Sequence, residues 1–115
     1  MAKNEIITTS GTHNVLATGT VIKGDICAEE DFRIDGTIEG DITCKGKIII
    51  GAQSSITGNI ECTNIEMMGK VTGNICCTNN IILRASANLN GEIKSQTIEI
   101  EPGAIFSGTC SMLTE

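Results

Sequence analysis

The phrase "GTIEGDITC" (residues 36–44) returns as "QSSITGNIEC" (53–62) and again as "GKVTGNICC" (69–77). Each copy has a glycine near its middle and a cysteine at its end. Aligning the whole chain on these glycines gives successive spacings of 16, 18, 15, 18 and 17 residues for Gly24, Gly40, Gly58, Gly73, Gly91 and Gly108. The chain therefore repeats with a period of about 17 residues.

Apolar residues flank every glycine of this column at every second position. Two residues before the glycines stand Ile22, Ile38, Ile56, Val71, Leu89 and Phe106, and two residues after them stand Ile26, Ile42, Ile60, Ile75, Ile93 and Cys110. Period-two alternation is typical of half-buried strands, because successive side chains point to opposite faces of a sheet. Isoleucine at this spacing would encircle a helix and is stiff there. The repeat is therefore predicted to be built from strands.

The cysteines that end the phrases form a further inward column. Its members are Ala28, Cys44, Cys62, Cys77, Ser95 and Met112. Because alanine and serine occupy the same column, a small side chain suffices there, and we expect buried free thiols on neighbouring turns. The N-terminus has no secretory signal, which favours reduced cysteines. Cys27 and Cys76 alternate outward and are the sites expected to oxidise first.

Short strands at a fixed period predict a solenoid in which each turn stacks on the one before. About 17 residues divide into three faces, so we predict an all-β, three-sided parallel β-helix of about six turns. Right-handed connections between parallel strands are the rule, which predicts a right-handed coil. Each glycine is expected either at an inward position in a narrow interior or at a bend. The "EPG" stretch at 101–103 predicts a type II turn.

The length of 115 residues allows one domain. We predict a disordered tail over residues 1–14, the β-helix over 15–112 and a short C-terminal tail over 113–115. The net charge of −6 and the near absence of aromatic residues argue against nucleic-acid binding. No apolar run approaches the length of a membrane span, so a cytoplasmic protein is expected.

The residue types that catalysis and metal binding need are scarce or scattered. His13, the single histidine, lies in the predicted tail, and the cysteine spacings contain no Cys-x2-Cys pair. Paired carboxylates such as Glu39 and Asp41 alternate outward onto an open sheet without enclosing loops. We therefore predict that the protein is not an enzyme and has no catalytic residue, cofactor or metal site.

The predicted coil has apolar residues up to both of its limits and no segment left to cap them, although soluble solenoids usually cap their ends. The residues expected to form an end-to-end interface are Leu16, Ile22, Ile98, Ile100, Phe106 and Met112. Phe106 replaces the aliphatic residues of its column, either to anchor the next subunit or to fill a wider last turn. Ile49 and Ile82 are in the outward phase and are candidates for lateral contact between filaments.

Four stretches in this order resemble the bactofilins, a bacterial polymer-forming cytoskeletal family. They are "GTVIKGDI" (19–26), "FRIDGTIEGDI" (32–42), "KIIIGAQSSITGNI" (47–60) and "IEIEPGAIFSGTC" (98–110). The resemblance implies a right-handed triangular β-helix that polymerises end to end, without nucleotide, into filaments. It also implies a scaffold for cell shape or for positioning envelope enzymes and membrane proteins.

In such proteins an N-terminal tail often engages the membrane. Here Ile6 and Ile7 are the apolar pair available for contact with the inner face of the cytoplasmic membrane.

Two other functional classes fit a three-sided coil. A trimeric hexapeptide-repeat acyltransferase is the stronger competitor, but it requires six-residue repeats and a catalytic histidine inside the coil. A monomeric binding module, for example for carbohydrate, would expose aromatic residues, whereas Phe32 and Phe106 both fall in inward columns. The leading hypothesis is therefore a homopolymeric scaffold subunit.

Overall fold

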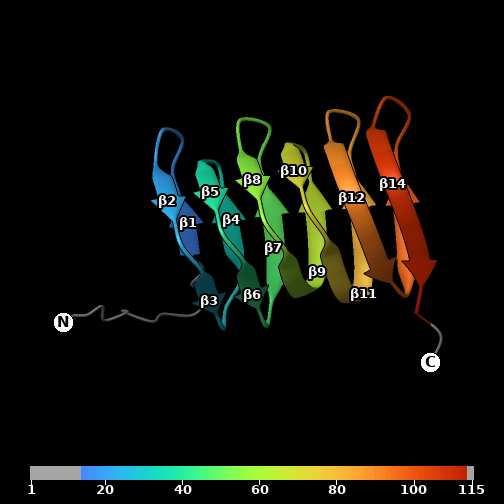
Figure 1. Cartoon of the computed structure of the whole chain (residues 1–115), viewed down its shortest axis with the longest axis horizontal. Helices are drawn as coiled ribbons and strands as arrows, with labels where there is room; N and C mark the ends of the chain where they lie inside the picture. Colours follow the sequence, from blue (N-terminus) through green and yellow to red (C-terminus); the bar gives the residue numbers. More distant parts are fainter. Residues whose placement is uncertain (1–13, 114–115) are drawn as a thin grey trace.

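The computed structural model describes residues 14–113, which form fourteen strands and contain no helix. The strands are β1 (Asn14–Leu16), β2 (Val21–Lys23), β3 (Ile26–Ala28), β4 (Phe32–Ile34), β5 (Thr37–Glu39), β6 (Ile42–Cys44), β7 (Lys47–Ile50), β8 (Ser55–Thr57), β9 (Ile60–Met67), β10 (Lys70–Thr72), β11 (Ile75–Leu83), β12 (Asn88–Ser95), β13 (Thr97–Ile100) and β14 (Ile105–Met112). All of their pairings are parallel, and together they make one continuous coil of six turns (Figure 1).

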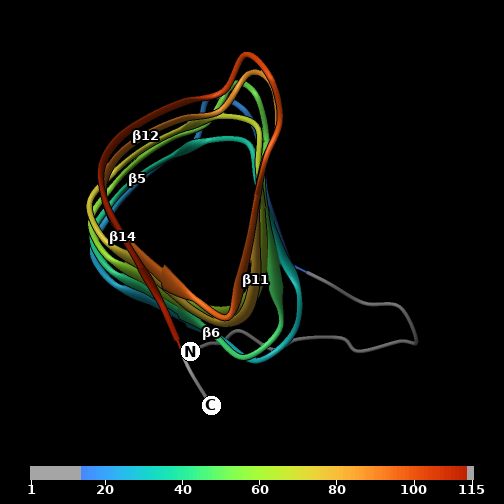
Figure 2. The ribbon, with the colours of Figure 1, turned by 90° about the vertical axis from the view of Figure 1, so that its right-hand side faces the viewer.

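The coil has three faces, which we name after the first strand on each. The β1 face carries residues 14–16, 32–34, 47–50, 64–67, 80–83 and 97–100. The β2 face carries 21–23, 37–39, 55–57, 70–72, 88–90 and 105–107. The β3 face carries 26–28, 42–44, 60–62, 75–77, 93–95 and 110–112. The predicted three-sided parallel β-helix is confirmed, and its triangular section is seen end-on in Figure 2.

The sense of the coil is visible when Figures 1 and 2 are compared. Figure 2 looks from the C-terminal side, and the chain passes from the β1 face through the protruding corner to the β2 face and then to the β3 face. This path is counterclockwise while the chain advances toward the viewer. The coil is therefore right-handed, as the general preference for right-handed crossovers predicted.

The core consists of the inward columns that the sequence defined. Ile42, Ile60, Ile75 and Ile93 stack in register and are fully buried. Cys44, Cys62 and Cys77 are also buried and unbridged, as predicted. β-branched side chains fit this interior because their restricted rotamers suit a pleated, close-packed surface.

The glycine column lies at the corner between the β2 and β3 faces. All six of its glycines have positive φ, from 143° to 155°. A Cβ atom at Gly58 would also collide with the carbonyl group of Gly40 in the preceding turn. Of the two roles considered for these glycines, the structure supports the bend.

The corner between the β1 and β2 faces has long loops in turns one, three, five and six and short loops in turns two and four. Four-residue loops at 17–20, 51–54, 84–87 and 101–104 are each closed by a hydrogen bond from the last N–H to the first carbonyl. They protrude along one edge in Figure 1, whereas turns two and four have only two residues there. In the last loop the Ala104 N–H bonds the Glu101 carbonyl at 3.1 Å and Gly103 has a φ of 99°, as the predicted type II turn requires.

Candidate self-association site at the ends of the coil

Each end of the coil has open strand edges. At the N-terminal end (residues 14–28), β1, β2 and β3 pair only with β4, β5 and β6 of the second turn. At the C-terminal end (residues 97–112), β13 and β14 pair only with β11 and β12 of the fifth turn. Within residues 14–113 no further strand covers either end. An unpaired row of N–H and C=O groups is a template for pairing with another chain.

The C-terminal end exposes the apolar core in cross-section. In the column that ends the β3 face, Ser95 is fully buried while Met112, its register partner in the last turn, is 53% exposed. On the β1 face Leu83 is fully buried and its partner Ile100 is 49% exposed. These residues continue inward columns and are exposed because no further turn covers them within residues 14–113.

Four of the predicted interface residues lie together at this end. Ile98 and Phe106 are half-buried and pack against the core, while Ile100 and Met112 are exposed. Cys110, which the sequence placed in an inward column, is also exposed, because it too belongs to the last turn. The C-terminal end therefore presents a compact set of aliphatic, aromatic and sulfur-containing side chains.

The N-terminal end holds the other two predicted interface residues. Leu16 is almost completely buried and Ile22 is half-buried. Ile26 and Ala28 on the β3 face are half-buried as well and pack against the core. Leu16, Ile26 and Ala28 are more buried than Ile100, Cys110 and Met112, which occupy the same columns at the C-terminal end.

Sequence reasoning missed three exposed residues that point outward on the terminal turns. Val21 at the first turn and Ile105 at the last are 57% and 55% exposed. They stand in one column of the β2 face, whose four middle members are Thr37, Ser55, Lys70 and Asn88. Val15, outward on the β1 face, is also 57% exposed. A signal was available: this column is polar in its four middle turns and apolar in its two terminal turns.

Ile49 and Ile82 lie on the β1 face, separated by Glu66 in the intervening turn. Both are half-buried. Glu66 receives the Arg84 Nε donor at 2.8 Å and the Lys47 ammonium at 3.4 Å, and Arg84 also binds Glu101 at 2.6 Å. The hydrogen bond from Arg84, assisted by Lys47, lowers the pKa of Glu66 below its usual range. Ile49 and Ile82 are thus separate apolar spots beside an ion-pair network that joins turns three to six.

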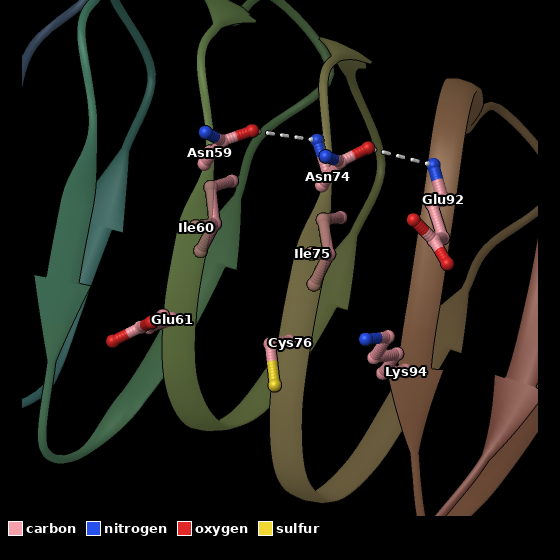
Figure 3. A pocket seen from close by; sticks show the side chains of 8 residues that line it. All are labelled: Asn59, Ile60, Glu61, Asn74, Ile75, Cys76, Glu92 and Lys94. Atoms are coloured by element: carbon pink, nitrogen blue, oxygen red, sulfur yellow. Dashed lines mark hydrogen bonds between the residues drawn. The ribbon is translucent and has the colours of Figure 1, made fainter.

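A polar ladder runs along the β2–β3 corner beside the glycine column. The side-chain oxygens of Asp25, Asp41, Asn59 and Asn74 each accept a hydrogen bond from the backbone N–H of the same position one turn later, at 2.9, 3.0, 3.1 and 3.2 Å. Figure 3 shows its last two steps, from Asn59 to Asn74 and from Asn74 to Glu92. All four bonds of this ladder run from backbone N–H donors to side-chain oxygens.

The groove beside this ladder is shallow and open. Ile60, Glu61, Ile75, Cys76 and Lys94 complete its lining (Figure 3). Within residues 14–113 no group of three or more His, Cys, Asp or Glu side chains is placed to hold a metal ion. The described part of the chain also contains no helix long and apolar enough to cross a membrane. Ile6, Ile7 and His13 lie outside the described residues.

Comparison with known proteins agrees with this geometry. Residues 14–111 match the family model described as "Bactofilin: Polymer-forming cytoskeletal". Bactofilin BacO of Myxococcus xanthus (strain DK1622) is 34% identical over 63 residues, which are 55% of this chain and 50% of BacO. The chain therefore spans about half the length of this curated relative.

Two solved structures share the fold. The bactofilin of Thermus thermophilus, determined by cryo-EM as double helical filaments, has a TM-score of 0.83 at 27% identity, covering 87% of this chain and 99% of that one. The cytoskeletal bactofilin BacA, determined by solid-state NMR, has a TM-score of 0.79 at 23% identity, covering 90% and 98%. From the family match over nearly all of its coil, we conclude that this chain belongs to the bactofilin family of polymer-forming cytoskeletal proteins.

Proposed function

We propose that this protein is a structural subunit that joins end to end, without nucleotide, into filaments. The observation that carries the proposal is the pair of uncapped ends, where strand edges are open and core columns reach the surface. Its similarity to a bactofilin determined in filaments supports it. The same architecture serves as subunit and as filament, because a second coil stacked on an end continues the first.

The apolar surface at the C-terminal end contributes part of the free energy that stabilises such a joint. Complete burial of one large aliphatic side chain contributes roughly 1.5–3 kcal/mol, so a half-exposed one contributes about 1 kcal/mol on docking. Ile100, Ile105 and Met112 are half-exposed, and Phe106 adds an aromatic surface. New backbone hydrogen bonds along the open edges add to this and fix the orientation of the partner.

Phe106→Arg tests the joint. A charge at this inward position of the last turn cannot be buried between subunits without a partner. We therefore expect monomers or short oligomers in sedimentation and electron microscopy. Thr72→Arg is the matched control, because Thr72 is exposed in the middle of the same face and its variant should still form filaments. Filaments of normal length from a folded Phe106→Arg variant would reject the end-to-end proposal.

The acyltransferase alternative is not favoured. A hexapeptide-repeat enzyme has a left-handed coil, whereas this coil is right-handed (Figure 2). No histidine lies within residues 14–113, and the grooves described there are shallow and open. Compact trimers in place of fibres in the sedimentation experiment would favour the acyltransferase class.

Ile49 and Ile82 are our candidates for side-by-side contact between filaments. Their half-buried side chains offer less apolar surface than the ends, and the neighbouring ion pairs require a partner with complementary polar groups. Ile82→Lys should leave single filaments intact and reduce their bundling in micrographs. Unchanged bundles would exclude this residue from lateral contact.

We assign the filament a cytoplasmic scaffold role in cell shape or in positioning envelope-related enzymes and membrane proteins. The tail pair Ile6 and Ile7 is the candidate for attachment at the inner face of the cytoplasmic membrane. Replacing both by serine should reduce co-sedimentation with anionic lipid vesicles while leaving polymerisation unchanged. Equal lipid binding by both proteins would remove the tail from this role.

A further inference from the structure

The inward cysteine column brings two buried thiols into direct contact. Cys62 on β9 and Cys77 on β11 are register partners on the β3 face, and their Sγ atoms are 3.1 Å apart. Neighbouring strands lie about 4.8 Å apart, within the range of about 4.4–6.8 Å that a disulfide requires between Cα atoms. The Cα spacing therefore suits a disulfide, and the two sulfurs are already in contact.

The surroundings give these two thiols unequal access to solvent. Cys62 retains 6% exposure and lines a shallow groove at the end of the β3 face, together with Cys44 and Lys45. Cys77 is fully buried behind it. Of the two cysteines that line this groove, Cys62 is slightly more exposed than Cys44, and its sulfur is in contact with that of Cys77.

We propose that Cys62 and Cys77 form an oxidisable dithiol, which a small hydroperoxide converts into a disulfide linking the third and fourth turns of the coil. In the first step the Cys62 thiolate attacks a peroxide oxygen, the O–O bond breaks, and a sulfenic acid forms. In the second step the Cys77 sulfur attacks the Cys62 sulfur, and the hydroxyl leaves with a proton as water. Two thiols lose two electrons and two protons, and hydrogen peroxide becomes two molecules of water.

The chemistry of the site predicts how this reaction depends on pH. The contact with Cys77, together with burial, raises the pKa of the Cys62 thiol well above its usual range. Because the thiolate is the attacking species, closure is slow at neutral pH and accelerates as the pH rises. The more accessible thiols of Cys27, Cys76 and Cys110 therefore react first and need to be removed for a clean measurement.

The test uses the full chain with Cys27, Cys76 and Cys110 replaced by serine. After treatment with hydrogen peroxide, blocking of free thiols and proteolysis, we expect a linked peptide pair containing Cys62 and Cys77. We also expect a higher melting temperature, reversed by reductant, because a cross-link restricts the unfolded chain. The linked peptide reports on the subunit alone, so its detection does not depend on whether the protein polymerises.

Two variants in this background separate the proposed pair from its neighbour. Cys77→Ser should abolish both the linked peptide and the shift in melting temperature, and Ser95 shows that the same column accepts serine. Cys44→Ser should retain both. Absence of the Cys62–Cys77 peptide from folded, oxidised protein, or a Cys44–Cys62 link in its place, would overturn the proposal.

Discussion

The glycines at the β2–β3 corner meet two separate backbone requirements. Their positive φ values are uncommon for residues with a side chain. From the second turn onward, a Cβ atom would also collide with the carbonyl group of the glycine one turn earlier. Gly24 differs, because it lies in the first turn of the described residues and a Cβ atom there would meet open space.

This difference predicts unequal effects of two identical substitutions. Gly24→Ala introduces only backbone strain and should lower the free energy of unfolding by roughly 1 kcal/mol. Gly58→Ala adds a backbone collision and should cost about 2–4 kcal/mol. Urea unfolding of both variants measures the difference. Equal losses would show that φ alone selects glycine in this column.

At the residue scale, alternation predicted which side of a strand each residue occupies, and exposure depended on its turn. Cys110 continues an inward column and is nevertheless exposed, because it lies in the last turn. Val21 follows the outward phase as expected, but its apolar character was not interpreted. Period-two reasoning treats every turn as if it had two neighbours, which is wrong for the first and the last.

At the scale of strands, charged side chains join turns that are distant in the sequence. Lys47 on β7, Glu66 on β9 and the loop residues Arg84 and Glu101 form a chain of ion pairs across four turns. Arg84 bonds both carboxylates and so holds the fourth and sixth turns to the fifth. Side chains on a parallel coil can interact in this way only if their turns are in register.

Glu66→Gln tests the contribution of this network. The folded-state pKa of Glu66 lies below the usual value of about 4.3, so the carboxylate stabilises the fold above that value and loses this effect as the pH falls through the folded pKa. At pH 7 the variant should be about 1 kcal/mol less stable than the parent. The difference should shrink below pH ~4 and disappear when Glu66 is protonated in the folded protein.

The matched control is Glu99→Gln, because Glu99 is exposed in the same column and forms no ion pair among the described residues. It should change the stability little at any pH. An equal and pH-independent loss in both variants would mean that the network contributes nothing specific.

The strands themselves were predictable, whereas their extent and the ion pairs were not. Alternation located the runs around each glycine, but β9 and β11 continue through the corner from the β3 face to the β1 face, over eight and nine residues. Because the glycine spacing varies from 15 to 18, the sequence did not define which outward residues become neighbours. Glu66 and Arg84 are 18 residues apart, and only the register showed that they meet.

Across the whole molecule, net negative charge is concentrated in the first two turns, whereas exposed apolar side chains occur at both ends. Residues 14–46 contain seven carboxylates against Lys23, Arg33 and Lys45, a net charge of −4. Residues 80–113 contain three carboxylates against Arg84 and Lys94, a net charge of −1. The exposed side chains of Ile100, Ile105 and Met112 all belong to this nearly neutral end.

This distribution predicts that salt promotes assembly. Between roughly 0.01 M and 1 M salt, the Debye length falls from about 30 Å to about 3 Å, which screens the repulsion between acidic first turns. The apolar contacts at the other end do not weaken under these conditions. Sedimentation across this range should therefore show more and longer polymer at high salt. Dissolution of the filaments by salt would indicate joints held by ion pairs.

The sequence alone was sufficient for the fold class, because it follows from columns that run through every repeat, whereas the end-to-end interface remains a prediction. Two features depend on which turns are first and last among the described residues. They are the contrast between Val21 and the polar middle of its column, and the unequal burial of Leu16 and Ile100. The lateral contact at Ile49 and Ile82 and the membrane contact at Ile6 and Ile7 remain predictions.

Each turn of the coil contacts only the turns before and after it. The coil is therefore a stack of equivalent turns, and the number of turns sets its length. Excising residues 60–74 would place Ile75 directly after Asn59, where Ile60 now stands, and would leave a shorter rod with the same two tips. Each turn adds about 4.8 Å to the axis, so gene length would translate into the spacing of subunits along a fibre in steps of that size.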